Sequence, residues 1–215
     1  MERSTNHTRQ DPRNFRVMIL FICVAVIAVL AVLFSSCDKT VFTDKVYEGD
    51  HFEIHYPYFL TEKYSDINEL ICDRLKACED ISYYINDNSL EGESKLTASY
   101  LEPYISDRYI SVAFSCYAYD IHAAHPSLFY ITVNYDIDSH KTVENIEFKY
   151  DEILNAVNEQ LDEDHRIAAM YSMESEAFLS DLDWAMDAEG YIVYITVGHA
   201  AGDCVSVRLP YDSID

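Results

Sequence analysis

The sequence predicts an α+β fold: an antiparallel sheet packed against helices and preceded by one N-terminal transmembrane or signal helix. Three observations lead to this prediction. Residues 17–34 form an unbroken apolar stretch. Farther along, several segments alternate apolar and polar residues, as strands do, and two others repeat apolar residues at helical spacing. Because most of the expected strands follow one another through short turns, we expect hairpins and therefore antiparallel pairing.

The N-terminal segment predicts membrane targeting. Val17 to Phe34 contains no charged residue, Pro or Gly, and as a helix it would be roughly 27 Å long, close to the thickness of a bilayer's hydrocarbon core. The preceding tail, residues 1–16, holds four Arg against two acidic residues. By the positive-inside rule this tail stays in the cytoplasm, and the remainder of the chain is exported.

Two fates fit the segment 17–36. Ser35 and Ser36 directly precede Cys37, an arrangement that resembles a bacterial lipobox, in which Cys37 would carry the lipid and begin the mature chain. The alternative is an uncleaved single-span anchor in which Cys37 is an ordinary interfacial cysteine. Either fate places the protein at the cell membrane with its main part outside the cytoplasm.

The exported part is very acidic. From Asp38 onward the chain has 11 Lys and Arg against 36 Asp and Glu, a formal charge of −25, whereas the whole chain carries −23. The negative electrostatic field of such a surface repels nucleic acid and anionic lipid and steers cationic partners toward it. We therefore expect no nucleic-acid partner. The alternative is that the acidity only confers solubility.

The first elements of the exported part follow from local patterns. Residues 37–51 show no long periodic pattern and are expected to form a tether, and a strand is predicted from Phe52 to Tyr58. A helix then begins near Ser65 or Asp66, which are suitable N-caps. Its apolar positions are Ile67, Leu70, Ile71, Cys78 and Ile81. The polar segment 86–94 predicts a loop.

Two long strands are predicted next, from Tyr109 to Ile121 and from Leu128 to Ile137. They form a hairpin around His122–Pro126, and residues 138–141 turn the chain into a third short strand. These elements complete the first half of the exported region, residues 52–142.

The second half of the exported region, residues 143–215, combines helices and strands. A helix is predicted from Tyr150 to Leu161, followed by another helical turn at 167–171. The segments 191–197 and 205–209 are rich in β-branched and aromatic residues, so they are predicted to be the final two strands.

Four cysteines lie in the exported part: Cys72, Cys78, Cys116 and Cys204. Export permits disulfides, but residues 72 and 78 lie on one predicted helix, about 9 Å apart along its axis and on different faces, so they do not pair with each other. The other pairings stay open, as does the alternative that the cysteines are reduced and buried.

Several short motifs occur in an order that resembles a known family. They are Tyr109–Phe114, Ala124-His125-Pro126, Val133–Asp136, Gly190–Tyr194 with Gly202, and Val205–Tyr211. Together they resemble the exported domain shared by the anti-sigma-V factor RsiV and the N-terminal part of the peptidoglycan deacetylase PdaC, over roughly residues 52–214. In the RsiV relatives this module resembles a sensor that binds lysozyme, a strongly cationic protein.

The resemblance implies a binding role for the exported module. Residues 1–16 are too few to grip a sigma factor, and no catalytic domain follows the shared region, so we expect neither anti-sigma nor deacetylase activity. The predicted function is a membrane-anchored, extracytoplasmic, non-enzymatic binding module for a lysozyme-like cationic protein or for peptidoglycan. The alternative is a cell-envelope enzyme that acts on glycan through a carboxylate pair, which the sequence does not single out among its many acids.

Tyrosines on the predicted strands are candidate binding residues. Tyr117, Tyr119, Tyr130 and Tyr135 would form a contact patch, because Tyr combines contact area with a hydrogen-bonding tip. The alternative is that these side chains belong to a partly buried sheet face.

His125 is the remaining candidate. With His122 and Asp120 it has the spacing of a metal pair across a tight turn. Its position directly before Pro126 instead favours a structural residue that hydrogen-bonds the backbone of the turn. The sequence therefore predicts no metal and no cofactor.

Overall fold

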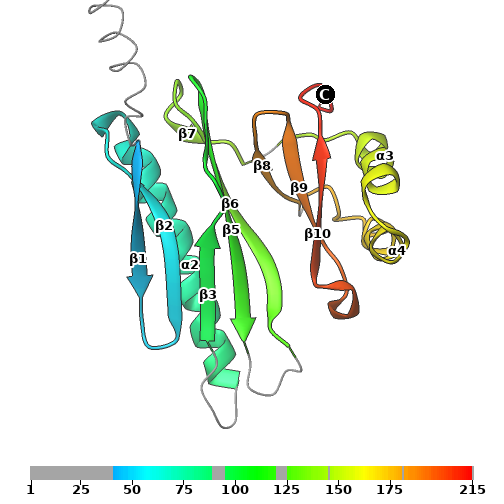
Figure 1. The fold of residues 1–215 in the computed structure, drawn as a ribbon, viewed down its shortest axis with the longest axis horizontal. Helices are drawn as coiled ribbons and strands as arrows, with labels where there is room; N and C mark the ends of the chain where they lie inside the picture. Colours follow the sequence, from blue (N-terminus) through cyan, green and yellow to red (C-terminus); the bar gives the residue numbers. More distant parts are fainter. Residues whose placement is uncertain (1–40, 89–94, 120–124, 145, 181, 215) are drawn as a thin grey trace, which may run out of the picture. The chain divides into compact units, whose positions relative to one another are not determined.

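The computed structural model describes residues 41–88, 95–119, 125–144, 146–180 and 182–214, with residues 77–88 described by backbone alone (Figure 1). Residues 1–16, which the sequence predicts to be a cytoplasmic tail, lie outside this part of the chain, as do the predicted span 17–36 and the lipid-attachment candidate Cys37. Within it, no helix combines the length and apolar character needed to cross a membrane.

Among the described residues, the larger sheet contains seven strands. They are β1 (Phe42–Glu48), β2 (Phe52–Phe59), β3 (Lys95–Tyr100), β4 (Tyr104–Ile105), β5 (Tyr109–Tyr119), β6 (Ser127–Asp136) and β7 (Lys141–Thr142). Their order is β1-β2-β3-β5-β6-β7, with β4 paired to β5. Every pairing is antiparallel except that of β2 with β3, which is parallel.

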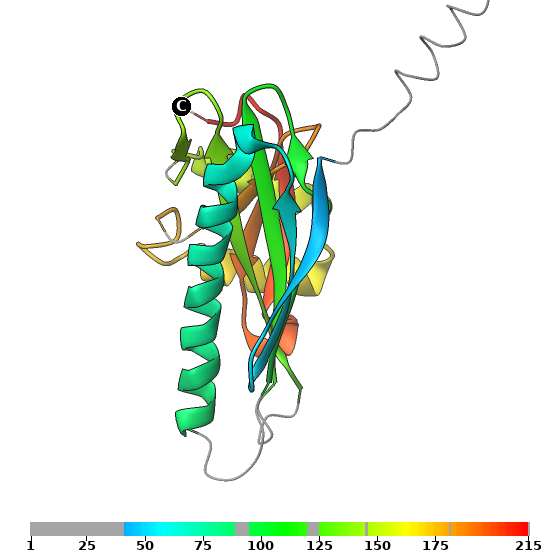
Figure 2. The same cartoon turned by 90° about the vertical axis from the view of Figure 1, so that its left-hand side faces the viewer.

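The α+β prediction is confirmed, but the prediction of a purely antiparallel sheet is wrong at one position. After β2, helix α2 (Ser65–Asn88) runs along one face of the sheet (Figure 2). This helix carries the chain back toward the end of the sheet at which β2 begins, so β3 enters parallel to β2. Alternation within single strands does not reveal such a crossover.

Strand β1 forms within the segment that the sequence suggests as a tether. It pairs with β2 from Phe42, opposite Phe59, to Glu48, opposite Glu53. Most of its side chains are exposed because it is an edge strand, so its sequence lacks the apolar alternation of a half-buried strand. The short strands β3 and β4 are likewise absent from the sequence-based prediction.

The second sheet consists, in the described chain, of β8 (Asp183–Met186), β9 (Tyr191–Thr196) and β10 (Cys204–Leu209), in the antiparallel order β10-β9-β8. Helices α3 (Tyr150–Gln160) and α4 (Glu163–Ser172) pack on it (Figure 1). The predicted helix at 150–161 and the final two strands are confirmed. The Asp162 carboxylate accepts a hydrogen bond from the backbone N–H of His165 at 3.0 Å and so caps α4.

Each sheet has its own hydrophobic core. Helix α2 buries Ile67, Ile71 and Leu75 against the larger sheet. On the second sheet, Ile153 of α3 and Ala169 of α4 are fully buried. The two sheets meet at a small third cluster formed by Ala113, Ala185 and Tyr194.

Two buried polar side chains also join the sheets. Asn134 Nδ2 donates to the carbonyl oxygen of Trp184 at 2.8 Å, and Ser111 Oγ accepts from the N–H of Met186 at 2.8 Å. Ser111 Oγ in turn donates to Asn134 Oδ1 at 2.6 Å. Trp184 and Met186 belong to β8, the last strand of its sheet. Side chains of β5 and β6 therefore form hydrogen bonds with backbone groups on the free edge of β8, as a neighbouring strand would.

A buried acid fixes the turn that follows β6. Asp136 Oδ1 accepts from the N–H groups of Asp138 and Ser139 at 2.9 and 3.1 Å, and Oδ2 accepts from Arg108 Nη2 at 3.0 Å. Burial alone would raise the pKa of Asp136, but the backbone hydrogen bonds and Arg108 outweigh it and lower the pKa below its usual value.

We expect Asp136→Asn to destabilise the fold in a pH-dependent way. Because the folded-state pKa is lowered, the carboxylate stabilises the fold above the unfolded pKa of about 3.9, and this contribution is lost as the pH falls through the folded value. The variant should be less stable than wild type at neutral pH, and the gap should close in acid. Urea unfolding of both proteins across this pH range measures the gap, and a gap that does not vary with pH would contradict the account.

Candidate functional site

One side of α4 is exposed and apolar at its centre. Ile167, Met170 and Tyr171 lie at helical spacings of three and four residues and are 57%, 43% and 78% exposed. The other side of the helix is anchored, because Ala169 and Met173 are buried in the second core. Exposed apolar clusters that are rimmed by polar residues are typical of interaction surfaces.

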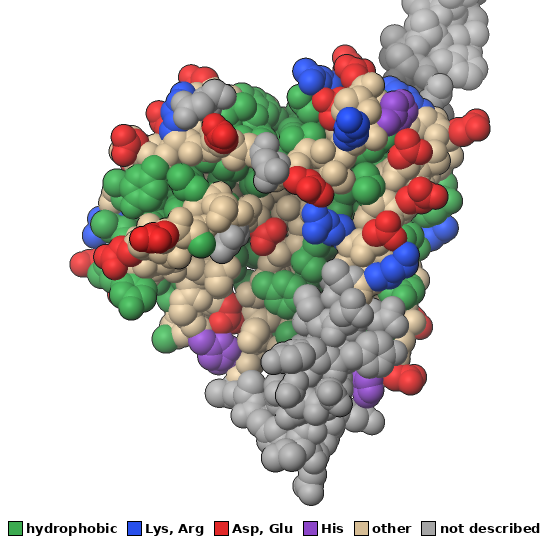
Figure 3. Space-filling model, turned by 180° about the vertical axis from the view of Figure 1, so that it is seen from behind, with side chains coloured by type: hydrophobic (Ala, Val, Ile, Leu, Met, Phe, Trp, Pro, Cys, Tyr) green, Lys and Arg blue, Asp and Glu red, His purple; other side chains and the backbone are tan. Residues whose placement is uncertain are grey.

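Acidic residues flank this apolar centre. Glu163 and Asp164 lie in the first turn of α4 and Glu174 lies just beyond its last turn, all exposed. The α4 outer face is defined here as Glu163, Asp164, Ile167, Met170, Tyr171 and Glu174. Residues 150–180 hold eight acidic residues and a single cationic one, Arg166. Figure 3 shows hydrophobic and acidic side chains interspersed toward the left of that view, where α3 and α4 lie.

Most cationic side chains elsewhere in the described chain already have partners. The ion pairs are Arg74–Glu144, Lys76–Asp73, Lys95–Glu53, Arg108–Asp136, and Arg208 with Asp187 and Glu189. The Lys45 ammonium lies 3.2 Å from the centroid of the Tyr58 ring. The acidic excess therefore stays largely uncompensated, and its field is strongest where acids are dense, as along residues 150–180.

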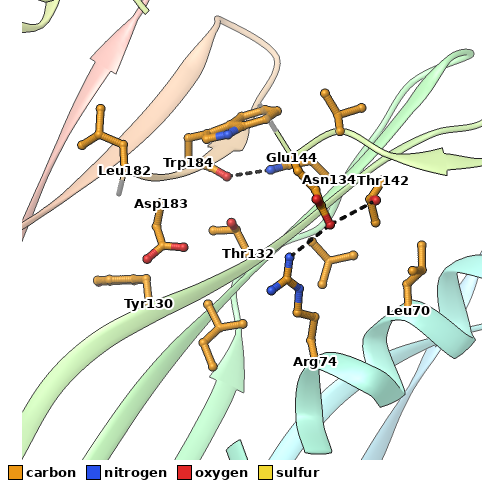
Figure 4. Close-up of a pocket in the computed structure, with 13 residues that line it drawn as sticks. Leu70, Arg74, Tyr130, Thr132, Asn134, Thr142, Glu144, Leu182, Asp183 and Trp184 are labelled. Atoms are coloured by element: carbon orange, nitrogen blue, oxygen red, sulfur yellow. Dashed lines mark hydrogen bonds and ion pairs between the residues drawn. The ribbon is translucent and has the colours of Figure 1, made fainter. Parts of the chain in front are cut away.

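A pocket of about 290 Å³ lies between α2, β6 and the start of β8 (Figure 4). Arg74 reaches into it from α2 and lies 3.8 Å from Glu144, measured from Nη2 to Oε1. Thr142 Oγ1 donates to the same carboxylate oxygen at 3.4 Å. Figure 4 shows Asp183 away from this group, on the side of the pocket where Tyr130 lies.

The two carboxylates of this pocket have different surroundings. Asp183 is exposed as a residue, yet the protein atoms around its carboxylate partly desolvate it and raise its pKa, while Arg74 opposes that shift. Glu144 is paired with Arg74, and its side chain is 61% exposed. Two carboxylates in unlike environments are what acid–base chemistry on a glycosidic bond requires.

The predicted tyrosine patch is divided between the two faces of the larger sheet. Tyr117 and Tyr119 are 46% and 43% exposed, on the same face as Tyr130. Tyr130 is half-buried and stacks on Tyr194, with ring centroids 4.1 Å apart. Tyr135 is fully buried on the opposite face, in the core under α2. Of the four tyrosines, Tyr117 and Tyr119 are the two whose side chains are exposed enough to contact a partner.

His125 is exposed at the start of the β6 hairpin arm. Its Nδ1 lies 3.1 Å from the carbonyl oxygen of Pro126, a backbone contact of the kind that the structural interpretation expects. Its ring stacks on that of His199, with centroids 3.5 Å apart. Asp120 and His122, the other members of the metal pair considered from the sequence, lie outside the described residues.

Three of the cysteines are described, and they are not joined by disulfides. Cys72 is exposed, Cys116 is buried in the first core and Cys204 is half-buried. Burial raises the pKa of the Cys204 thiol to about 12, with a further contribution from Asp183, so this thiol is protonated at neutral pH. The side chain of Cys78 lies outside the described part of the chain.

The sequence does not predict the α4 outer face as a site, although its signal is present. Ile167, Met170 and Tyr171 have the spacing of an apolar helical stripe, which normally indicates a core-facing side. In the structure this stripe does not face the core. The small residue Ala169 lies on the buried side of α4, and the larger apolar side chains of the stripe are exposed to solvent.

Two of the solved structures to which this chain is similar are DUF3298 family proteins. One is a DUF3298 family protein from Pseudomonas aeruginosa, with 13% identity and a TM-score of 0.46, covering 80% of this chain and 91% of that one. The other is a DUF3298 family member from Bacteroides fragilis, with 15% identity and a TM-score of 0.46, covering 81% and 93%. No protein-family model and no curated protein matches the sequence. The resemblance to the RsiV and PdaC domain stays a prediction.

Proposed function

We propose that this chain is a membrane-anchored, extracytoplasmic binding module that uses the α4 outer face to recognise a cationic protein of the lysozyme type. The observation that carries the proposal is an exposed apolar strip with acidic residues at both of its ends. A surface on which Lys and Arg surround apolar side chains complements it in charge and polarity. Anchoring through residues 17–36 or Cys37 would hold the module where such a partner arrives.

The two parts of the α4 outer face have different tasks in this proposal. The acids attract the partner from a distance and accelerate association, an effect that salt screens because the Debye length is about 8 Å at physiological ionic strength. Contacts buried at Tyr171 and Ile167 set the dissociation rate. Hot-spot residues, which are enriched in Tyr and lie near the centre of an interface, cost about 2 kcal/mol or more when truncated, so Tyr171 is the expected anchor.

Surface plasmon resonance of the full chain in detergent tests the proposal. The analytes are hen-type lysozyme and an unrelated protein of equal positive charge. We expect saturable binding to lysozyme alone, with an association rate that falls as salt rises and a dissociation rate that changes little. Equal weak binding to both proteins would indicate nonspecific charge attraction and contradict the proposal. If the chain binds peptidoglycan fragments but not lysozyme, the partner is a cell-wall component and the proposal of a cationic protein is wrong.

A second candidate function, a cell-envelope enzyme that acts on glycan, is favoured by the pocket that holds Asp183 and Glu144. Asp183, with its raised pKa, would donate a proton to the glycosidic oxygen, and Glu144 would act as the base or nucleophile. This function would be supported if the wild-type protein releases reducing ends from peptidoglycan and both Asp183→Asn and Glu144→Gln abolish that release. Release that survives in both variants would exclude the pocket as its site.

A further inference from the structure

We propose a site for a divalent transition metal of the zinc class, formed by His125, His199 and Asp203. His125 lies two residues before the hairpin arm β6, whereas His199 and Asp203 belong to the connection between β9 and β10. A donor atom of each residue lies within 4.8 Å of the donor atoms of the other two. The site therefore joins the two halves of the exported region, and none of its three residues belongs to the α4 outer face.

Asp203 is held in place before any ligand binds. Its Oδ2 accepts from the backbone N–H of Leu128 at 2.9 Å, and its Oδ1 lies 2.5 Å from His199 Nδ1. The backbone of Asp203 has a positive φ of 68° and follows Gly202, whose φ is 91°. Its carbonyl oxygen accepts from the N–H of Val197 at 2.8 Å. The loop thus presents the carboxylate, whose side chain is 14% exposed, in a fixed position.

The arrangement of the donor atoms suits a cation. His199 Nδ1 and Asp203 Oδ1 lie 2.5 Å apart, so a metal ion would take the place of the proton that these two atoms share. A ring nitrogen of His125, whose ring stacks on that of His199, would supply the third donor.

The donor set favours zinc over the common alkaline-earth ions. Two imidazole nitrogens and one carboxylate oxygen are ligands that zinc accepts, whereas Mg²⁺ and Ca²⁺ prefer oxygen alone. Zinc-to-ligand distances of about 2.1 Å place the donors of a tetrahedral site about 3.4 Å apart. His125 and His199 are both exposed, so their stacked rings are free to tilt toward that spacing. A water molecule would complete the four-coordinate site.

Isothermal titration calorimetry of the full chain in detergent tests the proposal with zinc chloride as the probe. Excess Mg²⁺ occupies the acidic surface, so a remaining zinc signal reports a site with nitrogen donors. We expect one saturable event per chain and a higher melting temperature with zinc, because the metal links the β6 hairpin arm to the β9–β10 connection. The absence of a saturable event would overturn the proposal.

Four variants locate the site. His125→Ala and His199→Ala should each abolish the saturable event, and Asp203→Asn should weaken the zinc affinity about 10–100-fold. His55→Ala is the matched control. His55 lies within 3.4 Å of two carboxylates, but among the described residues it belongs to no group of side chains that could hold a metal ion. Zinc binding that persists in His125→Ala, for example through cysteine thiols, would overturn the assignment. Loss of zinc binding in His55→Ala would overturn it as well.

Discussion

Asn134→Ala is expected to lower the free energy of unfolding by about 3 kcal/mol. The change removes the donor to the Trp184 carbonyl oxygen and the acceptor for the Ser111 hydroxyl, and each buried group left without a partner costs about 1–3 kcal/mol. Trp184 is the only Trp in the sequence, so its fluorescence during urea unfolding reports directly on the affected strand.

Asn158→Ala is the matched control for this prediction. Asn158 is exposed on α3, where its Nδ2 donates to the Leu154 carbonyl oxygen at 2.8 Å, so its loss should have little effect on stability. Ser111→Ala should also destabilise the fold, and the double variant with Asn134→Ala should fall short of the sum of the two single effects, because both residues belong to one network. Equal effects of Asn134→Ala and Asn158→Ala would contradict the role of the network.

Gly190→Ala is expected to destabilise the fold by on the order of 3 kcal/mol for a steric reason. A Cβ atom at position 190 would lie 2.0 Å from the carbonyl oxygen of Leu209, a backbone atom of β10 that is not free to move aside. The neighbouring Tyr191 pairs with Leu209 in the β9–β10 ladder, so the clash would push the two strands apart where they begin to pair.

Gly198→Ala provides the matched control for Gly190→Ala. Position 198 has φ −64° and ψ 148°, a conformation that Ala adopts readily, and a Cβ atom there meets no atom within 4 Å. We expect its free energy of unfolding to change by less than about 1 kcal/mol, in the stabilising direction. A Gly190→Ala protein as stable as the Gly198→Ala protein in urea would contradict the close approach of β9 and β10 at this point.

The elements that the sequence predicts well are those with strong local patterns. The hairpin of β5 and β6 alternates apolar and polar residues, and its strands end within two residues of the predicted limits. The helix at 150–161 repeats apolar residues every three to four positions. Strand β1 lacks such a pattern because it is an edge strand, and the parallel entry of β3 depends on the path of α2 rather than on its own residues.

The candidate sites are less predictable because they depend on tertiary packing. The spacing of Ile167, Met170 and Tyr171 predicts an amphipathic helix but does not say which side is covered. Tyr135 belongs to a tyrosine-rich strand, yet the sheet register places it in the core. His125 meets His199 only because the β6 hairpin arm and the β9–β10 connection lie together in the fold, which no short-range pattern records.

The kinetics of lysozyme binding to variants of the α4 outer face test the central claim most directly. Tyr171→Ala should raise the dissociation rate about 10-fold or more. Glu163→Gln with Asp164→Asn should mainly slow association and weaken its salt dependence. Tyr117→Ala and Glu62→Gln with Glu69→Gln, which change an exposed Tyr and two exposed acids elsewhere, should leave both rates near those of wild type. Lysozyme binding with the same rates in wild type and in all α4 variants would contradict the assignment of this surface.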